Sequence, residues 1–228
     1  MKKTEMKVTK LFTLGHTLAK PLLERYEYPW EALPHIGDFI RTLGESLPSS
    51  EYHSPMKGLY IHKTAKVAPT AGIIAPAVIG AGAEIRHGAF IRGNVLIGAN
   101  AVVGNSTELK NVILFDQVQV PHYNYVGDSI LGYQAHMGAG AITSNVKSDK
   151  TLVKVHTADG DIETGLKKFG AMLGDKVEVG CNCVLNPGTV AGKKSNIYPL
   201  SNVRGCVPPN SIYKKLGEIA AKEENKNM

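Results

Sequence analysis

The chain contains 228 residues, and its 26 Lys and Arg against 20 Asp and Glu give a formal net charge of +6. This length suits one large domain with an appendage. The positive charge favours small anionic ligands such as phosphates, while the scatter of the basic residues argues against nucleic acid. Polar residues open the chain and no apolar stretch approaches about 18 residues, so we expect no secretory signal, no membrane span and a cytoplasmic location.

The first segment, residues 1–52, carries the spacing of amphipathic helices. Apolar side chains recur there at Ile36, Phe39, Ile40, Leu43 and Leu47. This spacing predicts a helix over residues 35–47, and a shorter helical piece is expected around residues 18–26. Tyr26 and Trp30 are expected to anchor the segment, which we predict to be a cap over the open end of the domain that follows.

A six-residue period organises residues 53–210. Aliphatic side chains stand at every sixth position: Ile61, Val67, Ile73, Ile79, Ile85, Ile91, Ile97, Val103 and Leu109. Most positions four residues further on carry a small side chain. A period of six fits neither an amphipathic helix nor a half-buried strand, and it predicts an all-β solenoid, the parallel β-helix of hexapeptide repeats.

The period changes twice along the chain. It slips after Leu109 and is regular again from Leu131. It is absent over residues 146–170, where turn residues between two short apolar pieces predict a hairpin in a loop extruded from the coil. It resumes at Leu173, and residues 211–228 have a helical spacing that predicts a C-terminal helix and tail.

The slip contains a polar motif, His122-x-x-Tyr125-x-Gly127-Asp128, which lies shortly before the segment Gly138-Ala139-Gly140-x-Ile142-Thr143-x-Asn145. Over about residues 60–210 the chain resembles the acetyltransferase domain of bifunctional N-acetylglucosamine-1-phosphate uridylyltransferase/glucosamine-1-phosphate acetyltransferase. The resemblance implies a left-handed parallel β-helix that forms a homotrimer with active sites at subunit boundaries. It also implies direct acetyl transfer from acetyl-CoA to an amino-sugar phosphate, without a metal, within nucleotide-sugar biosynthesis for the cell envelope.

The resemblance assigns roles to individual residues. It implies that His122 is the general base and that Tyr125 and Asn145 contact the sugar and the acetyl group. The residues matched to the substrate's phosphate and sugar are Arg92, Lys110 and His136, and those matched to acetyl-CoA are Ala139 and Cys181. Lys150, adjacent to Thr151, could serve as a further phosphate-binding residue. His136, Thr151 and Cys181 replace the family's usual Asn, Lys and Ser, so the exact amino sugar stays open.

Elementary chemistry supports these roles. Acetyl transfer to an amine needs a base that titrates near neutral pH, which suits histidine. An Asn side chain, for which Asn145 is the predicted catalytic residue, or turn N–H groups can stabilise the oxyanion. The adenosine phosphates of coenzyme A need cations, and the basic residues of the last coils are candidates: Lys193, Lys194 and Arg204.

Three alternatives remain for comparison. A γ-type carbonic anhydrase requires two zinc-binding histidines five residues apart, and no such pair exists here. A nucleotide-linked amino sugar, or non-catalytic binding of a sugar phosphate by a scaffold, stays open. The first fifty residues carry no Gly-rich phosphate loop, so uridylyl transfer is not expected. The three cysteines are predicted to be reduced thiols rather than zinc ligands.

Overall fold

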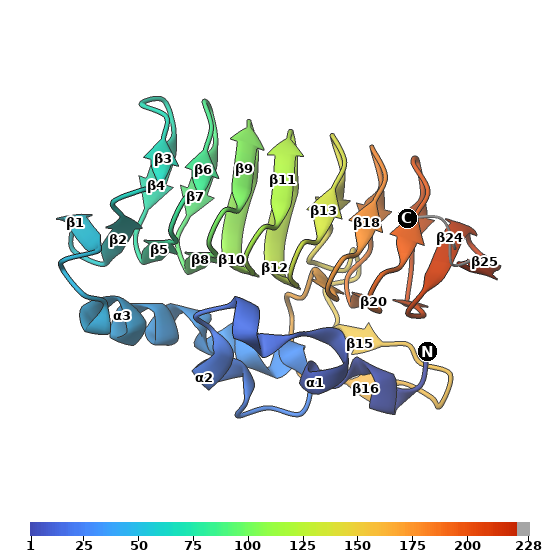
Figure 1. Cartoon of the computed structure of the whole chain (residues 1–228). Helices are drawn as coiled ribbons and strands as arrows, with labels where there is room; N and C mark the ends of the chain where they lie inside the picture. The colour runs from blue at the N-terminus through green and yellow to red at the C-terminus, as the bar shows by residue number, and fades with distance from the viewer. Residues whose placement is uncertain (223–228) are drawn as a thin grey trace.

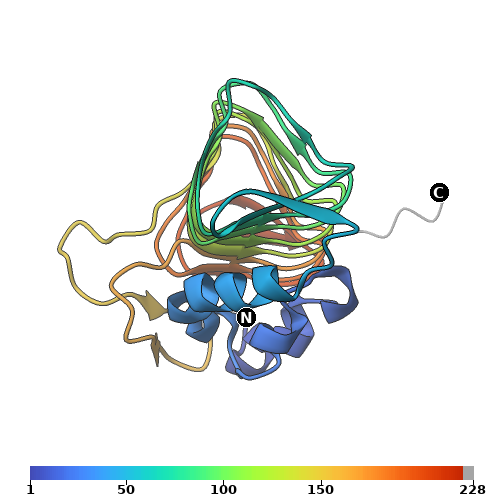
Figure 2. The ribbon, with the colours of Figure 1, turned by 90° about the vertical axis from the view of Figure 1, so that its left-hand side faces the viewer.

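The computed structural model describes residues 1–222 and shows a three-sided solenoid, seen from the side in Figure 1 and along its axis in Figure 2. Strands on successive coils pair in parallel. The predicted left-handed parallel β-helix is therefore confirmed. The aliphatic residues of the six-residue period point into the coil, and from Ile79 to Leu109 they are at most 1% exposed.

Each coil contributes strands to three faces. The first face contains β4 (Gly72–Ile74), β7 (Phe90–Arg92), the beginnings of β10 (Glu108–Leu114) and β12 (Tyr125–Leu131), β14 (Ile142–Thr143), β19 (Val184–Leu185) and β22 (Asn202–Val203). The second contains β1 (Tyr52–Met56), β2 (Leu59–His62), β5 (Ala77–Ile79), β8 (Val95–Ile97), the ends of β10 and β12, β17 (Ala171–Leu173), β20 (Thr189–Ala191) and β23 (Cys206–Val207). The third contains β3 (Lys66–Val67), β6 (Glu84–Ile85), β9 (Val102–Asn105), β11 (Gln119–His122), β13 (His136–Met137), β18 (Glu178–Val179), β21 (Asn196–Ile197), β24 (Ser211–Lys215) and β25 (Glu218–Ala221).

The slip in the period is a shortening of two coils, and the stacking of the coils continues through it. Glu108 pairs with Phe90, 18 positions earlier, whereas Tyr125 pairs with Glu108, 17 positions earlier. The missing residue is at the corner between the first and second faces, which β10 and β12 cross without interruption. Asn111 and Asp128 occupy this corner with φ of 56° and 47°, a conformation that Asn and Asp tolerate.

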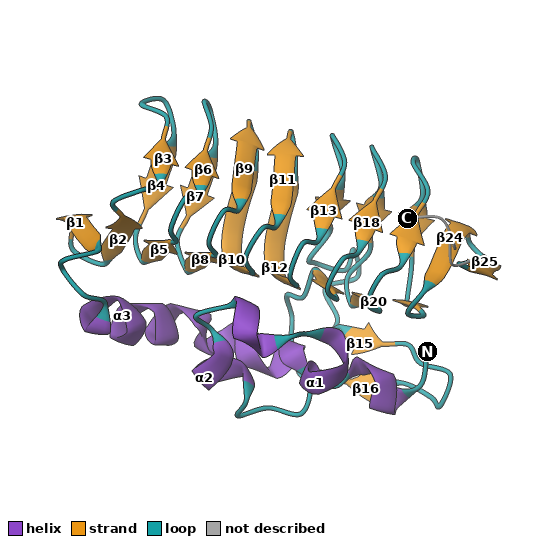
Figure 3. Ribbon diagram, in the orientation of Figure 1, coloured by secondary structure: helices purple, strands orange, loops and turns teal. Residues whose placement is uncertain are grey.

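The N-terminal segment is helical, as Figure 3 shows in purple. It consists of η1 (Lys3–Met6), α1 (Val8–Leu11), η2 (Leu14–His16), α2 (Lys20–Leu23), η3 (Pro29–His35) and α3 (Ile36–Ser46), where η denotes a 3-10 helix. The helix predicted over residues 35–47 is confirmed as α3. Trp30 is 1% exposed and stacks on Phe169 at a centroid distance of 5.6 Å, so it does anchor the segment to the solenoid.

The prediction that this segment covers the open end of the coil stack is wrong, because the helices lie along the second face (Figure 2). The reason is an apolar stripe of outward-pointing residues on that face, each at most 1% exposed: Val78, Leu96, Ile113, Ile130, Met172 and Val190. An exposed stripe of this size must be covered, and the helices bury it. The end of the stack stays open, and Val67 in the first coil is 36% exposed.

Two further expectations concern the loop and the C-terminus. The predicted hairpin is confirmed as the antiparallel pair β15 (Lys154–Val155) and β16 (Ile162–Glu163). The predicted C-terminal helix is wrong over residues 211–222, where β24 and β25 form an antiparallel hairpin on the last coil. Tyr213 is 3% exposed and continues the inward positions of the coil, so its strand pairing outweighs the helical spacing. The rest of that prediction falls on residues 223–228, outside the described part of the chain.

Candidate functional site

The corner between the first and second faces, here the Asp128 corner, gathers several of the predicted residues around one buried carboxylate. Asp128 is 4% exposed. It accepts hydrogen bonds from Nδ2 of Asn145 at 2.6 Å and of Asn111 at 3.0 Å, and Lys110 Nζ lies 3.4 Å from its Oδ2. Asn145 Nδ2 also donates to Tyr125 Oη at 3.2 Å. Burial, and then the charge of Asp128, raise the pKa of Tyr125.

The two cations expected to hold a phosphate already have acidic partners. Arg92 forms a short ion pair with Glu108, and this hydrogen bond raises the pKa of Arg92. Lys110 is paired with Asp128. Each pair bridges two successive coils and both include a residue of β10, because β10 pairs with β7 on one side and with β12 on the other. A phosphate arriving here would meet a cluster that is neutral overall and would have to share or replace these carboxylates.

His122 stands at a different corner, between the third and first faces, here the His122 corner. It ends β11, and its side chain is exposed. Its backbone N–H donates to Oδ1 of Asn124 at 3.1 Å. Asn124 is 2% exposed inside the corner, and its Nδ2 donates to the carbonyl oxygens of Gly138 at 2.8 Å and Ala141 at 3.0 Å. The Asn124 side chain therefore ties the His122 turn to the following coil.

The predicted acetyl-CoA contacts continue this corner. Gly140 N–H donates to His122 O at 3.0 Å, and Asn182 N–H donates to Ala139 O at 2.8 Å. His122, Ala139 and Cys181 consequently stack on three successive coils, and the Cys181 side chain is exposed. The strand that follows His122 begins with Tyr125 on the first face. That face thus extends from the His122 corner to the Asp128 corner.

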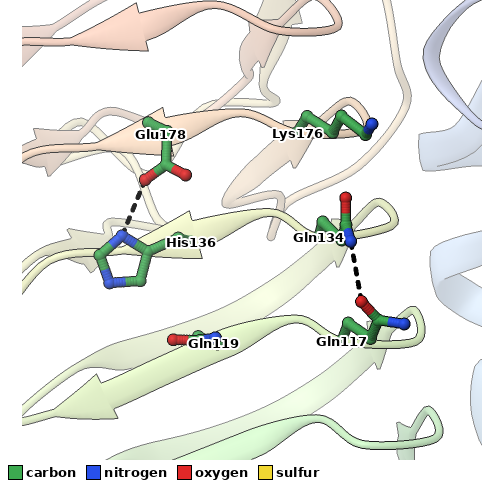
Figure 4. A pocket seen from close by; sticks show the side chains of 6 residues that line it. All are labelled: Gln117, Gln119, Gln134, His136, Lys176 and Glu178. Carbon is green, nitrogen blue, oxygen red and sulfur yellow. Dashed lines mark hydrogen bonds and ion pairs between the residues drawn. The ribbon is translucent and has the colours of Figure 1, made fainter. Parts of the chain in front are cut away.

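His136 lies apart from both corners. It begins β13 on the third face and lines an open polar pocket of about 450 Å³. Figure 4 shows the side chains of Gln119 and Glu178, which line the same pocket. Its Nδ1 lies 2.9 Å from Glu178 Oε2. Within one chain, His136 does not meet the Lys110 and Tyr125 cluster to which the resemblance assigns it.

The basic candidates are divided among separate surfaces. Lys193 Nζ lies 2.8 Å from Oδ2 of Asp175, which is 4% exposed and also accepts hydrogen bonds from Thr13 at the corner between the second and third faces. Lys193 therefore has a structural role in holding the N-terminal segment, and its neighbour Lys194 lies at the same corner. Arg204 is at the opposite side of the second face, where it lines a pocket with the extruded loop, and Lys150 belongs to that loop.

Asn124 and Asn111 are the residues of these two corners that the sequence reasoning missed. Asn124 stands four residues after Val120, where the hexapeptide pattern places a small side chain, and this departure was a usable signal. No sequence signal marked Asn111, because its role depends on the shortened corner rather than on a departure from the hexapeptide pattern. Within residues 1–222, no three His, Cys, Asp or Glu side chains are arranged to hold a metal ion, and no helix is long and apolar enough to cross a membrane.

Comparison with known proteins gives one family and several partial relatives. The family described as GMPPB C-terminal domain matches residues 73–198. The chain is 33% identical over 109 residues to a bifunctional sugar-1-phosphate nucleotidylyltransferase/acetyltransferase of Sulfurisphaera tokodaii, covering 48% of this chain and 27% of that protein. It is 33% identical over 121 residues to the bifunctional protein GlmU of Methanococcus vannielii, covering 53% of this chain and 29% of that protein. The chain thus spans less than a third of the length of these two relatives.

Shorter and structural relatives were also found. The chain is 31% identical over 103 residues to the putative uncharacterized acetyltransferase YaiX of Escherichia coli, covering 45% of each protein. Among solved structures, a hexapeptide transferase family protein from Anaplasma phagocytophilum has 17% identity and a TM-score of 0.41, covering 73% of this chain and 80% of that one. The polySia-specific acetyltransferase NeuO has 13% identity and a TM-score of 0.45, covering 72% and 87%.

Proposed function

The chain belongs to the GMPPB C-terminal domain family, and we propose from this premise that it is an acetyl-CoA-dependent N-acetyltransferase acting on an amino-sugar phosphate. The observation that carries the proposal is the stack of His122, Ala139 and Cys181 on three successive coils of one corner. An exposed histidine there stands beside the surface expected to bind the acetyl thioester. Relatives that are named as acetyltransferases support the same reaction class.

In the proposed reaction, the amine nitrogen of the sugar attacks the carbonyl carbon of the acetyl thioester. His122 accepts the proton that the amine loses, as a general base positioned by the bond between its N–H and Asn124. The tetrahedral intermediate then collapses, the carbon–sulfur bond breaks, and the proton passes from His122 to the leaving thiolate. No covalent acetyl-enzyme is required.

The oxyanion of the intermediate needs a fixed donor, and we assign this role to the backbone N–H of Ala139. This N–H forms no hydrogen bond within residues 1–222 and stands one coil from His122. Asn145, predicted as the catalytic amide, donates instead to Asp128 and Tyr125 in its own chain. Its proposed role is therefore to orient Tyr125 toward the sugar rather than to bind the oxyanion.

The phosphate of the substrate is proposed to bind at Arg92 and Lys110. Their present partners, Glu108 and Asp128, would then share the cations with the phosphate, which favours a substrate that offers more than one anionic oxygen. Because the two corners flank the first face, the sugar would lie across Tyr125. We also propose a homotrimer, in which a neighbouring subunit covers this face.

The test is a coenzyme A release assay with acetyl-CoA and a panel of amines that includes glucosamine-1-phosphate and nucleotide-linked amino sugars. We expect turnover with at least one amine, and we expect His122→Asn to lower kcat by about a hundredfold or more. The matched control is His87→Asn, which removes an exposed histidine from the same corner two coils earlier and should leave the rate unchanged. Acetyl-CoA binding without turnover on any amine would favour the non-catalytic scaffold, and full activity of His122→Asn would exclude the mechanism.

A further inference from the structure

The extruded loop encloses a pocket beside the Asp128 corner. Residues 146–156 lie against the coils that carry Asn186 and Arg204, and the space between them has a volume of about 410 Å³. Ser144, which leads into the loop, lines the same pocket, and the next residue, Asn145, contacts Asp128. The pocket therefore adjoins the proposed substrate site and is separate from the stack at the His122 corner.

The walls of this loop pocket carry an excess of positive charge. Lys147 and Lys154 come from the loop and Arg204 from the coil, and Asp149 is the only carboxylate among the lining residues. Lys147 Nζ lies 3.3 Å from Asp149 Oδ2, and Lys154 Nζ lies 2.6 Å from Glu163 in the other strand of the hairpin. Arg204 forms no ion pair with any of residues 1–222, so its guanidinium is free to receive an anion.

The loop wall is held in place by its own hydrogen bonds. The Asp149 carboxylate accepts from Thr151 N at 3.0 Å and Thr151 Oγ1 at 2.8 Å, and these bonds lower the pKa of Asp149. Further along the loop, Cys206 Sγ donates to His156 O at 3.1 Å, which fastens the loop beside the coil of Arg204. Both walls of the pocket are thus formed before a ligand arrives, and this preorganisation favours binding.

The shape and charge of the loop pocket fit a diphosphate better than a single phosphate. Its volume lies within the range of about 300–1,000 Å³ that is typical of ligand sites. Cations come from both the loop and the coil, and arginine binds phosphate oxygens in a bidentate manner. We propose that the loop pocket binds the diphosphate group of a nucleotide, either in a nucleotide-linked amino sugar or in coenzyme A. This proposal rests on the proposed function, because the acetyltransferase reaction supplies the two candidate ligands.

The first test is calorimetric titration of the full chain with coenzyme A, pantetheine, uridine diphosphate and uridine monophosphate. We expect a diphosphate-bearing ligand to bind and Arg204→Gln to weaken it by about ten- to a hundredfold. The control, Arg25→Gln, makes the same change on the N-terminal segment, where the Arg25 side chain bonds only Pro21 O within residues 1–222, and should have no effect. Equal affinity of wild type and Arg204→Gln for every diphosphate would overturn the proposal.

Steady-state kinetics then show whether coenzyme A or the nucleotide-linked sugar supplies the diphosphate. They also test the loop pocket separately from the proposed acetyltransferase activity. If coenzyme A supplies the diphosphate, Arg204→Gln raises the KM for acetyl-CoA and leaves that for acetyl-pantetheine unchanged. If the nucleotide sugar supplies it, the variant raises the KM for the nucleotide-linked amine and leaves that for the amino-sugar-1-phosphate unchanged. Diphosphate binding that depends on Arg204 in a chain without turnover would support the pocket while refuting the transferase. Turnover with unchanged KM values in Arg204→Gln would refute the pocket alone.

Discussion

Replacing Asn124 with alanine tests whether one buried amide holds the His122 corner in place. Asn124 makes three hydrogen bonds through its side chain, from His122 N–H and to the carbonyl oxygens of Gly138 and Ala141, and it is 2% exposed. At about 1 kcal/mol for each bond, we expect Asn124→Ala to lower the free energy of unfolding by about 3 kcal/mol.

The matched control is Ser201→Ala, at the same inner corner position two coils after Ala141. Asn124, Ala141 and Ser201 each immediately precede the first-face strand of their coil. Ser201 is 6% exposed, and its Oγ has no hydrogen-bond partner in residues 1–222. Both variants place an alanine at the same corner, but only Asn124→Ala removes side-chain hydrogen bonds. Ser201→Ala should therefore change the free energy of unfolding by less than about 0.5 kcal/mol.

Urea unfolding followed by far-UV circular dichroism measures the loss of the solenoid, and the single tryptophan, Trp30, reports the N-terminal segment separately. We expect the midpoint for Asn124→Ala to fall well below those of wild type and Ser201→Ala. If the two alanine variants unfold at the same urea concentration, the amide does not fix the corner, and the positioning of His122 has to be explained in another way.

The remaining predictions concern the second face and its covering. Ile130→Ala, on the buried outward stripe, should cost about 2–4 kcal/mol in urea unfolding, whereas Val102→Ala, at a half-buried outward position on the third face, should cost less than half as much. Gly44→Ala should destabilise the chain although alanine favours helices, because the added Cβ would lie 2.1 Å from the Tyr60 ring; a gain in melting temperature would contradict this packing. Burial raises the pKa of Cys206 to about 12, so at pH 9 only about one thiol in a thousand is ionised, and disulfide reagents should label it only after unfolding, as mapped by mass spectrometry.

The inward side of the solenoid could be predicted from the sequence because each hexad repeats the same local requirement. An aliphatic residue such as Ile79 or Ile97 must fill the coil whatever the rest of the chain does. The outward stripe could not be predicted in the same way. Ile113 and Ile130 stand 17 positions apart, and only the true length of these coils shows that they lie on the same face. The position of the N-terminal helices depends on this stripe.

The candidate site likewise contains some features that the sequence predicts and others that depend on the three-dimensional arrangement of the coils. His122 and Ala139 stack across a coil of 17 residues, one fewer than three hexads, and a motif with fixed spacing still locates both residues. The pairing of Lys110 with Asp128 depends on a corner that is one residue shorter than the repeat, and no local pattern gives the partner of either charge. The separation of His136 from this cluster likewise depends on which face a strand occupies, which spacing alone does not determine.

The Asp128 corner also explains why the chain can leave the solenoid at residues 146–170 and return in register. The returning loop is hydrogen-bonded to the backbone of this corner: Phe169 N–H donates to Asn145 O and Gly170 N–H to Asp128 O, each at 2.9 Å. A Cβ on Gly170 would lie 2.2 Å from Gly127 O, so only glycine permits this approach. The loop return then presents Phe169 to Trp30. The proposed substrate site, the loop pocket and the N-terminal segment are thereby joined at one corner, and a change that displaces Gly170 must disturb all three.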